Sequence, residues 1–219
     1  MRAIVPAYNE AATVAGVVAP LVKCGRFEEV IVVDDGSKDA TSQIAADAGA
    51  RVIRTARNSG KGGAMLYAVQ QCCGADDHVA FFDADLIGLR PEHALSLCQA
   101  IDVGYDMACG LRDWGTVQNV VQLAFAPVIT GERVLARWVL DALPMSCWSG
   151  YSIETAMNDV VARNGGRTAL MFFRGVIVRS KAEKTGVVQG FKGHYKMARE
   201  IMNTRKALRD SRGATCRRS

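Results

Sequence analysis

The chain has 219 residues, of which 49% are apolar and 22% are charged, and its formal net charge at pH 7 is +5. These values predict a folded soluble protein of about one domain. Residues 190–219 contain nine Lys and Arg against two acids, which leaves 18 against 20 for residues 1–189. Because the main body lacks a basic patch interleaved with aromatic residues, we expect no nucleic-acid partner.

Three features of the sequence bear on its location. The chain passes from Met1 directly into a strand-like apolar run, without the regions of a secretion signal. Its longest apolar window, residues 120–129, is about half the length that a transmembrane helix needs. The seven cysteines form no Cys-x-x-Cys pair, which is typical of free thiols in a reducing compartment. We therefore expect a cytoplasmic protein, which could also contact the inner face of the membrane.

Apolar strands and helices alternate along the first 82 residues. The patterns predict strands at 2–6, 29–33, 51–54 and 78–82 and helices at 10–23, 40–48 and 61–73. Asn9 and Asp39 are the expected caps of the first two helices. Alternation of this kind implies right-handed crossovers. The predicted fold class is therefore α/β, with a mostly parallel central sheet flanked by helices.

The rest of the chain is less regular. It predicts helices at 91–103, 116–127 and 152–164, a strand at 106–109, a strand or bend at 129–136 followed by a helix, and a pair of strands at 168–173 and 175–179. Residues 191–208 carry an apolar stripe opposite a row of Lys and Arg, which predicts an amphipathic helix.

Acidic residues follow three of the predicted strands. Glu10 follows the first, Asp34 and Asp35 follow the second, and Asp83 and Asp85 follow the fourth. Carboxyl ends of parallel strands form the edge where open α/β sheets bind ligands. Carboxylates at such an edge suit Mg²⁺ or Mn²⁺ carrying a diphosphate, although Asp-x-Asp alone is also a common turn sequence.

A glycine-rich turn at residues 58–63 (Asn-Ser-Gly-Lys-Gly-Gly) places Lys61 at a helix start, where phosphate oxygens bind favourably. The turn lacks the Walker spacing, and no Gly-x-Gly-x-x-Gly follows the first strand. These absences count against a nucleoside triphosphatase and against an NAD-dependent enzyme.

Four segments, in this order, resemble the family 2 glycosyltransferases, which have the GT-A fold: residues 5–10 (Val-Pro-Ala-Tyr-Asn-Glu), 32–39 (Val-Val-Asp-Asp-Gly-Ser-Lys-Asp), 58–62 and 82–85 (Phe-Asp-Ala-Asp). The resemblance implies a nucleoside-diphosphate sugar as donor and Mg²⁺ or Mn²⁺ as cofactor. It implies donor binding by Pro6, Ala7, Tyr8, Glu10, Asp35, Ser37, Gly60, Lys61, Asp83 and Ala84, and metal binding by Asp83 and Asp85. The expected organisation is a nucleotide-sugar-binding half at 1–112, an acceptor half at 113–189, and a basic helix and tail at 190–219.

Further likenesses concern the acceptor half. Arg112 is similar to the arginine of the Gly-Ser-Arg segment in dolichyl-phosphate mannose synthases, although Leu86-Ile87 departs from that branch. Residues 150–154 (Gly-Tyr-Ser-Ile-Glu) are similar to a Gly-Tyr-Gly-x-Glu segment of glucosyl-3-phosphoglycerate synthase. The same resemblance implies that His194 corresponds to that enzyme's third metal ligand, which comes late in its chain. The alternative is that His194 is a surface or packing residue. The expected catalytic residues are Asp85, Arg112, Glu132 and Glu154. The two glutamates are assigned to acceptor positioning or base work, with surface or capping acids as the alternative.

The expected reaction is the transfer of one sugar, in which the metal and Lys61 neutralise the leaving diphosphate. Polymer synthesis is not expected, because the Glu-Asp base and Gln-x-x-Arg-Trp motifs are absent. A phosphate acceptor needs no base, and Arg112, Arg133 and the basic helix could hold it. Polyprenyl phosphate is favoured because the 191–208 stripe suits a membrane interface; 3-phosphoglycerate is the alternative. A sugar nucleotidyltransferase is disfavoured, while a non-catalytic nucleotide-sugar-binding protein and a homodimer stay open.

Overall fold

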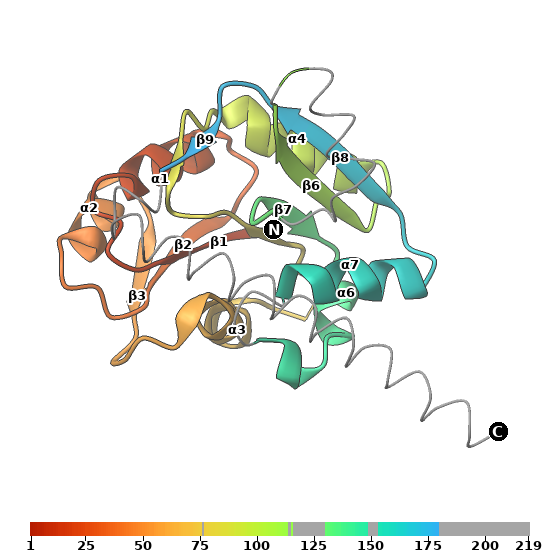
Figure 1. The fold of residues 1–219 in the computed structure, drawn as a ribbon, viewed down its shortest axis with the longest axis horizontal. Coiled ribbons are helices and arrows are strands. Elements are labelled where there is room, and N and C mark those ends of the chain that lie inside the picture. The colour runs from red at the N-terminus through yellow and green to blue at the C-terminus, as the bar shows by residue number, and fades with distance from the viewer. Residues whose placement is uncertain (76, 114, 116–129, 149–152, 180–219) are drawn as a thin grey trace.

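The structure is a computed structural model that describes residues 1–75, 77–113, 115, 130–148 and 153–179. Its elements in chain order (Figure 1) are β1 (Arg2–Ala7), α1 (Val14–Lys23), β2 (Glu29–Asp34), α2 (Thr41–Asp47), β3 (Arg51–Arg54), α3 (Gly60–Cys72), β4 (Val79–Phe81), β5 (Leu86–Ile87), α4 (Pro91–Asp102), β6 (Met107–Arg112), β7 (Arg133–Leu135), α6 (Arg137–Asp141), the 3₁₀ helix η1 (Met145–Trp148), α7 (Ile153–Arg163), β8 (Thr168–Phe173) and β9 (Ile177–Val178). Among these helices, none has the length and apolar character that a bilayer span requires. The helix predicted at 116–127, His194 and the basic segment lie outside the described residues.

Seven of the described strands form one sheet, in the order β3-β2-β1-β4-β7-β6-β8. Neighbouring strands are parallel except at β7, which runs antiparallel to both β4 and β6. The predicted α/β class with a mostly parallel sheet is confirmed. As a result of these directions, the carboxyl ends of β1, β2, β4 and β6 and the beginning of β7 lie at one edge of the sheet.

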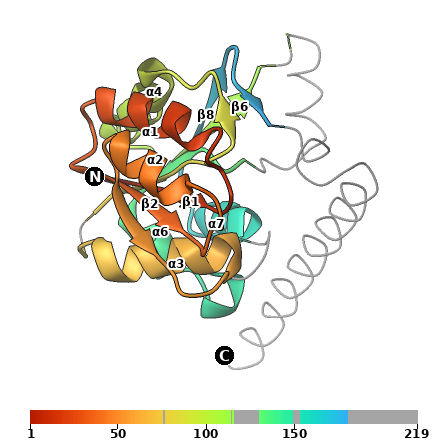
Figure 2. The ribbon, with the colours of Figure 1, turned by 90° about the vertical axis from the view of Figure 1, so that its left-hand side faces the viewer.

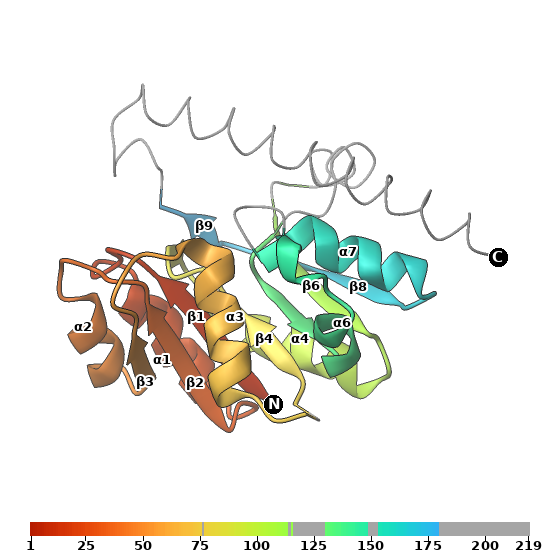
Figure 3. The same cartoon turned by 90° about the horizontal axis from the view of Figure 1, so that it is seen from below.

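Helices cover both faces of the sheet, as Figure 3 shows from below. One face packs against α1, α2 and α4, and α1 lies between the other two (Figure 2). The opposite face packs against α3, α6 and α7. Ala3 and Val5 of β1 point into the first core and Ile4 points into the second, and all three are fully buried. Burial on both faces explains why the parallel strands read as nearly continuous apolar runs.

The turn after β1 differs from its prediction. Helix α1 begins at Val14 rather than near Glu10, and Asn9 adopts a left-handed backbone with φ of 56°. Its side-chain Oδ1 accepts the Lys38 N–H at 2.8 Å, and its own N–H donates to Ser37 Oγ at 2.9 Å. Asparagine tolerates this conformation and competes for main-chain groups, so it joins two loops instead of capping a helix.

The predicted cap of the second helix lies one residue too early. Helix α2 begins at Thr41, so the capping position belongs to Ala40. Asp39 nevertheless accepts the Thr41 N–H on Oδ1 at 3.1 Å, and its Oδ2 accepts the N–H of Ala11 at 3.2 Å. The carboxylate therefore joins the start of α2 to the loop that follows β1.

The two strands predicted near the end of the described region form, but in separate sheets. Strand β8 pairs with β6, whereas β9 pairs with β5, a strand that the sequence did not predict. A Cβ at Gly88 would lie 2.4 Å from the Gly175 carbonyl oxygen, so the turns beside β5 and β9 meet closely at a glycine. The Arg179 N–H donates to the Asp85 carbonyl at 3.0 Å, which fixes the segment that follows β4.

Candidate active site

The sheet edge described above gathers many of the residues predicted for donor and metal binding. The loops after β1, β2 and β3 form a polar network around Asp34 and Asp35. Farther along the edge lies a second group, here called the Lys61 cluster, which consists of Lys61 at the start of α3, Asp83 after β4, Glu132 before β7, and Glu154 in the first turn of α7. The edge therefore carries two separate groups of charged side chains.

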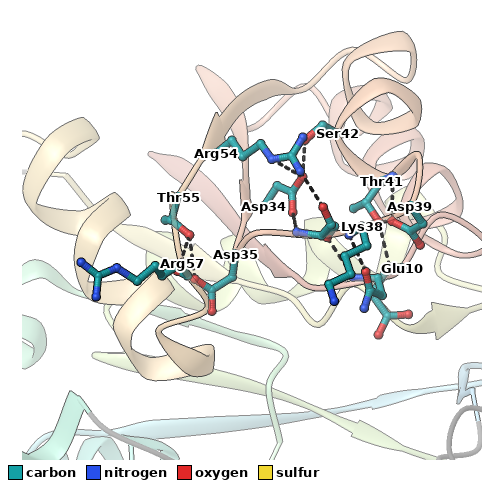
Figure 4. A network of polar contacts seen from close by, with 12 residues as sticks. Glu10, Asp34, Asp35, Lys38, Asp39, Thr41, Ser42, Arg54, Thr55 and Arg57 are labelled. Carbon is teal, nitrogen blue, oxygen red and sulfur yellow. Dashed lines mark hydrogen bonds and ion pairs between the residues drawn. The ribbon is translucent and has the colours of Figure 1, made fainter.

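Asp34 stabilises the turn that follows β2 (Figure 4). It is fully buried; its Oδ1 accepts the Ser37 N–H at 2.7 Å and its Oδ2 accepts the Ser42 hydroxyl. Arg54 Nε lies 3.8 Å from the same Oδ2. Burial alone would raise the pKa of Asp34, but the bonds from Ser37 and Ser42, assisted by Arg54, hold it below its ordinary value. Asp34 is therefore a charged structural residue.

Asp35 holds the glycine-rich turn in place. Its carboxylate accepts the Thr55 hydroxyl at 2.8 Å, the Ser59 N–H at 2.8 Å and the Gly60 N–H at 2.8 Å (Figure 4 shows Thr55 beside it). The first N–H groups of a helix have no partner within the helix, so Asp35 satisfies donors at the start of α3. This role could not be predicted from the sequence, because the partners lie 20 to 25 residues away. Donor binding by Asp35 stays a prediction.

The other donor-binding residues predicted near β1 and β2 lie close together, because the two strands pair in parallel with Ala7 opposite Asp34. Tyr8 is exposed, and Pro6 and Glu10 are half-buried. Ala7 and Ser37 are buried. Tyr8 is thus the aromatic side chain that this part of the edge offers to a ligand.

Lys61 is held between two carboxylates. Its Nζ lies 2.6 Å from Asp83 Oδ1 and 2.7 Å from Glu154 Oε1. Burial alone would lower the pKa of Lys61, but these carboxylates raise it. Burial would likewise raise the pKa of Asp83, but the charge of Lys61, with those of Arg112 and Arg133, lowers it. About a quarter of each of the Lys61 and Asp83 side chains stays exposed, at 25% and 26%, so a ligand can reach this ion pair.

The two glutamates of the cluster are both buried. Glu132 is 2% exposed and its Oε2 accepts the Thr130 hydroxyl, while Glu154 is 4% exposed. Within the described part of the chain, Glu132 Oε1 and Glu154 Oε2 have no hydrogen-bond partner. Burial, assisted by the charge of Asp83, raises the pKa of Glu132 to about 7 against the opposing bond from Thr130. Buried unpaired oxygens suit a cation or a ligand that donates hydrogen bonds.

Gly131 leaves the space that Asp83 occupies. A Cβ built at Gly131 would lie 2.3 Å from Asp83 Oδ1 and 2.4 Å from its Cγ and Oδ2. With a larger residue at this position, the Asp83 carboxylate and the main chain before β7 cannot both keep their positions. The reason for a glycine at residue 131 is therefore its contact with Asp83, which is distant in the sequence.

We expect Gly131→Ala to lower the free energy of unfolding by about 2 kcal/mol, because the added methyl group overpacks the site. Gly16→Ala is the matched control, since a Cβ placed on Gly16 would meet nothing within 4 Å and the residue sits inside α1. That control should raise stability by up to about 1 kcal/mol through helix propensity. Urea unfolding of both variants measures the difference; equal stabilities would contradict the contact.

The predicted metal ligands are only partly described. Asp85 is half-buried at the sheet edge, beside the buried Ala84, and His194 lies outside the described residues. In the described ranges, no group of three or more His, Cys, Asp or Glu side chains is arranged to hold a metal. The oxygens of Asp83 and Asp85 and the unpaired oxygen of Glu132 nevertheless have the chemistry that a hard divalent cation requires. The assignment of Asp83, Asp85 and His194 as metal ligands therefore stays a prediction. The oxygen atoms available at the site are consistent with it.

The two arginines expected to hold an acceptor phosphate differ. Arg112 ends β6 at the same edge and is half-buried. Arg133 is 0% exposed, and its guanidinium donates to the carbonyl oxygens of Thr130 and Glu154. The prediction that Arg133 binds phosphate is therefore wrong, because no ligand can reach a fully enclosed side chain. No pattern in the sequence indicated this burial.

A protein-family model described as glycosyl transferase family 2 matches residues 3–122. Glycosyltransferase AglJ of Haloferax volcanii is 31% identical over 188 residues, which cover 77% of this chain and 60% of the relative. Glucosyl-3-phosphoglycerate synthase of Mycobacterium tuberculosis is 26% identical over 211 residues, which cover 92% of this chain and 54% of the relative. An undecaprenyl-phosphate 4-deoxy-4-formamido-L-arabinose transferase of Pseudomonas fluorescens is 32% identical over 120 residues, covering 50% and 34%. The chain thus spans 60% or less of the length of these relatives.

Solved structures of the same mycobacterial synthase have the same fold. Its complex with Mn²⁺ and UDP-glucose superposes with a TM-score of 0.67 at 26% identity, covering 82% of this chain and 71% of that chain. Its complex with phosphoglyceric acid superposes with a TM-score of 0.72 at 23% identity, covering 93% and 77%. These likenesses confirm the GT-A architecture predicted from the sequence.

Proposed function

The chain belongs to glycosyl transferase family 2, and on this premise we propose that it transfers one sugar from a nucleoside-diphosphate sugar to a phosphate-bearing acceptor, with Mg²⁺ or Mn²⁺ as cofactor. The observation that carries the proposal is the position of Lys61, which lies at a helix start between Asp83 and Glu154. A fixed cation at such a place suits the negative charge that grows on a leaving diphosphate. The relative that is 26% identical in its solved structure was crystallised with Mn²⁺ and UDP-glucose, which supports this donor class.

The residues of the Lys61 cluster have different roles in the proposed reaction. Lys61 gives up its contact with Asp83 or with Glu154 and binds a diphosphate oxygen instead. Its positive charge then stabilises the negative charge of the leaving group. The unpaired oxygens of Glu132 and Glu154 accept hydroxyl groups of the sugar or of the acceptor. Asp83 and Asp85, with His194 as the predicted third ligand, hold the metal, which supplies further neutralisation of the diphosphate when bound.

For the acceptor, the breadth of the matches favours a soluble phosphorylated acid. The likeness to glucosyl-3-phosphoglycerate synthase extends over 92% of this chain, whereas that to the undecaprenyl-phosphate transferase covers 50%. We assign the acceptor phosphate to Arg112, and its half-buried position at the end of β6 supports this assignment. The polyprenyl phosphate favoured by the sequence depends on residues 191–208, which are not described, and it stays the alternative. The cytoplasmic location, membrane contact and a homodimer also stay predictions.

The donor site is tested by thermal unfolding with UDP, GDP, dTDP and ADP sugars, each with and without Mn²⁺. We expect one nucleotide to stabilise the protein with metal, by about 1.4 kcal/mol at ten times its Kd. Asp85→Ala should abolish the metal-dependent part, whereas the exposed Asp47→Ala on α2 should not. If no nucleotide stabilises the wild type, the proposed donor site is wrong.

The acceptor is tested with the donor so identified, by measuring sugar transfer to 3-phosphoglycerate and to polyprenyl phosphate in vesicles. Transfer to the soluble acid supports the favoured acceptor. Transfer to the vesicles alone supports the lipid alternative. Tight donor binding without transfer to either would instead favour a non-catalytic nucleotide-sugar-binding protein.

A further inference from the structure

Arg133 connects the two chain segments that carry the glutamates of the Lys61 cluster. We propose that Arg133 is a positioning residue: by binding the main-chain carbonyls of Thr130 and Glu154, it fixes the start of β7 and the start of α7 relative to each other and so keeps Glu154 on Lys61. The structural part of this proposal, that Arg133 fixes the two segments, does not depend on the proposed function. The effect on catalysis rests on the proposed sugar transfer.

The guanidinium of Arg133 makes contacts in two directions. Toward the segment before β7, Nε and Nη2 donate to the Thr130 carbonyl at 3.1 and 2.6 Å. Toward the first turns of α7, Nη1 donates to the Glu154 carbonyl at 3.3 Å and to Asn158 Oδ1 at 3.2 Å. Glu154 in turn contacts Lys61 at 2.7 Å through its side chain. One planar, rigid group thus sets the distance between two segments that lie about 20 residues apart in the chain.

The contacts of Arg133 affect the positions of both Glu132 and Glu154. Thr130, whose carbonyl Arg133 binds, also donates its hydroxyl to Glu132 Oε2. A shift of Thr130 would therefore move Glu132, and a shift of the first turn of α7 would move Glu154. A misplacement of about 1 Å at a catalytic site can cost about a hundredfold in rate.

Packing alone does not account for an arginine at this position. Within the described part of the chain, no carboxylate lies within ion-pair distance of Arg133, although the side chain is 0% exposed. Burying a charge costs several kcal/mol, and well-packed apolar residues often replace such groups without loss. The neighbours at Nη1 include the sulfur atoms of Met107 and Met157, at 3.6 and 3.7 Å, so a methionine would suit the same space. A methionine there would lose the bonds to the two carbonyls and to Asn158, and also the charge that helps to lower the pKa of Asp83.

The test uses Arg133→Met and Arg133→Lys in the full chain. We expect kcat to fall about 10- to 100-fold in the methionine variant while KM for the donor changes less than about threefold. The lysine variant should recover part of kcat, because its ammonium group retains the charge and can still donate to one of the two carbonyls. A crystal structure of Arg133→Met should show Lys61 Nζ and Glu154 Oε1 separated beyond ion-pair distance. Arg137→Met is the control, since Arg137 also donates to a main-chain carbonyl, that of Gly74, but lies on α6 outside the cluster.

The positioning role of Arg133 would be overturned by wild-type kcat in both variants, or by a crystal structure that keeps the Lys61 to Glu154 contact at 2.7 Å. Failure of both variants to fold would also overturn it, because Arg133 would then serve the fold itself. If the wild type transfers no sugar, the proposed function fails, and the variant crystal structure alone decides whether Arg133 positions Glu154.

Discussion

Replacing Lys61 with methionine is expected to lower kcat for sugar transfer by about 10²- to 10³-fold, the usual cost of removing one group that stabilises charge in the transition state. Methionine has nearly the same length as lysine but carries no positive charge, so it cannot stabilise the negative charge of the leaving diphosphate. The substitution also leaves the Asp83 and Glu154 carboxylates without their shared partner at 2.6 and 2.7 Å. Steady-state kinetics with the nucleotide sugar found by thermal unfolding measures the effect.

The matched control for this prediction is Lys38→Met. Lys38 is exposed in the loop after β2, and the contact that the structure shows for it, from its main-chain N–H to Asn9, survives the substitution. The control should therefore keep its turnover and its stability. A Lys61→Met enzyme that retained half of the wild-type kcat would contradict the assignment of Lys61 to the leaving group.

The second large effect concerns pH. We expect Glu132 to lower the free energy of unfolding of the metal-free protein by up to about 3 kcal/mol between pH 5 and pH 8. Burial, with the nearby charge of Asp83, raises the pKa of Glu132 from 4.5 to about 7 in the folded state. The folded protein therefore holds this proton more tightly than the unfolded chain. The stabilisation is complete below pH 4.5 and is lost as the pH rises through 7.

Glu132→Gln removes the titrating group while keeping its shape, so its stability should vary less with pH than that of the wild type. Urea unfolding at pH 5, 6, 7 and 8 gives both curves. Glu92→Gln serves as the control, because Glu92 lies on α4 with 74% of its side chain exposed. Parallel wild-type and Glu132→Gln curves would show that Glu132 is ionised in the folded protein throughout this range.

The sequence predicted those parts of the molecule that local patterns determine. Strand β3 has the predicted bounds, β1 and β2 are each one residue longer at the carboxyl end, and β4 is one residue shorter at each end. The agreement is close because apolar runs buried on both faces can be recognised along the chain. The acids at the ends of β2 and β4 were placed at one sheet edge for the same reason. Parallel pairing brings those ends together once the strands are recognised.

The remaining features depend on contacts between distant segments, which no local pattern records. The contacts of Asp35 with the start of α3 were not predicted, because the groups that donate to its carboxylate lie 20 to 25 residues away in the chain. Strand β5 is two residues long and forms only because β9 lies beside it. Arg133 was expected to hold the acceptor phosphate, but it is buried, and the carbonyls of Thr130 and Glu154 accept its hydrogen bonds.

The order of strands limits how proteins with this fold can be recombined. In the described sheet, β6 has β7 and β8 as its neighbours, and both come later in the chain than residue 122, where the family match ends. A fragment that stopped there would leave β6 without a neighbouring strand. A chimera that exchanged the acceptor side should therefore be joined between α4 and β6, so that β6, β7 and β8 come from a single parent even though the sequence motifs suggest a later boundary.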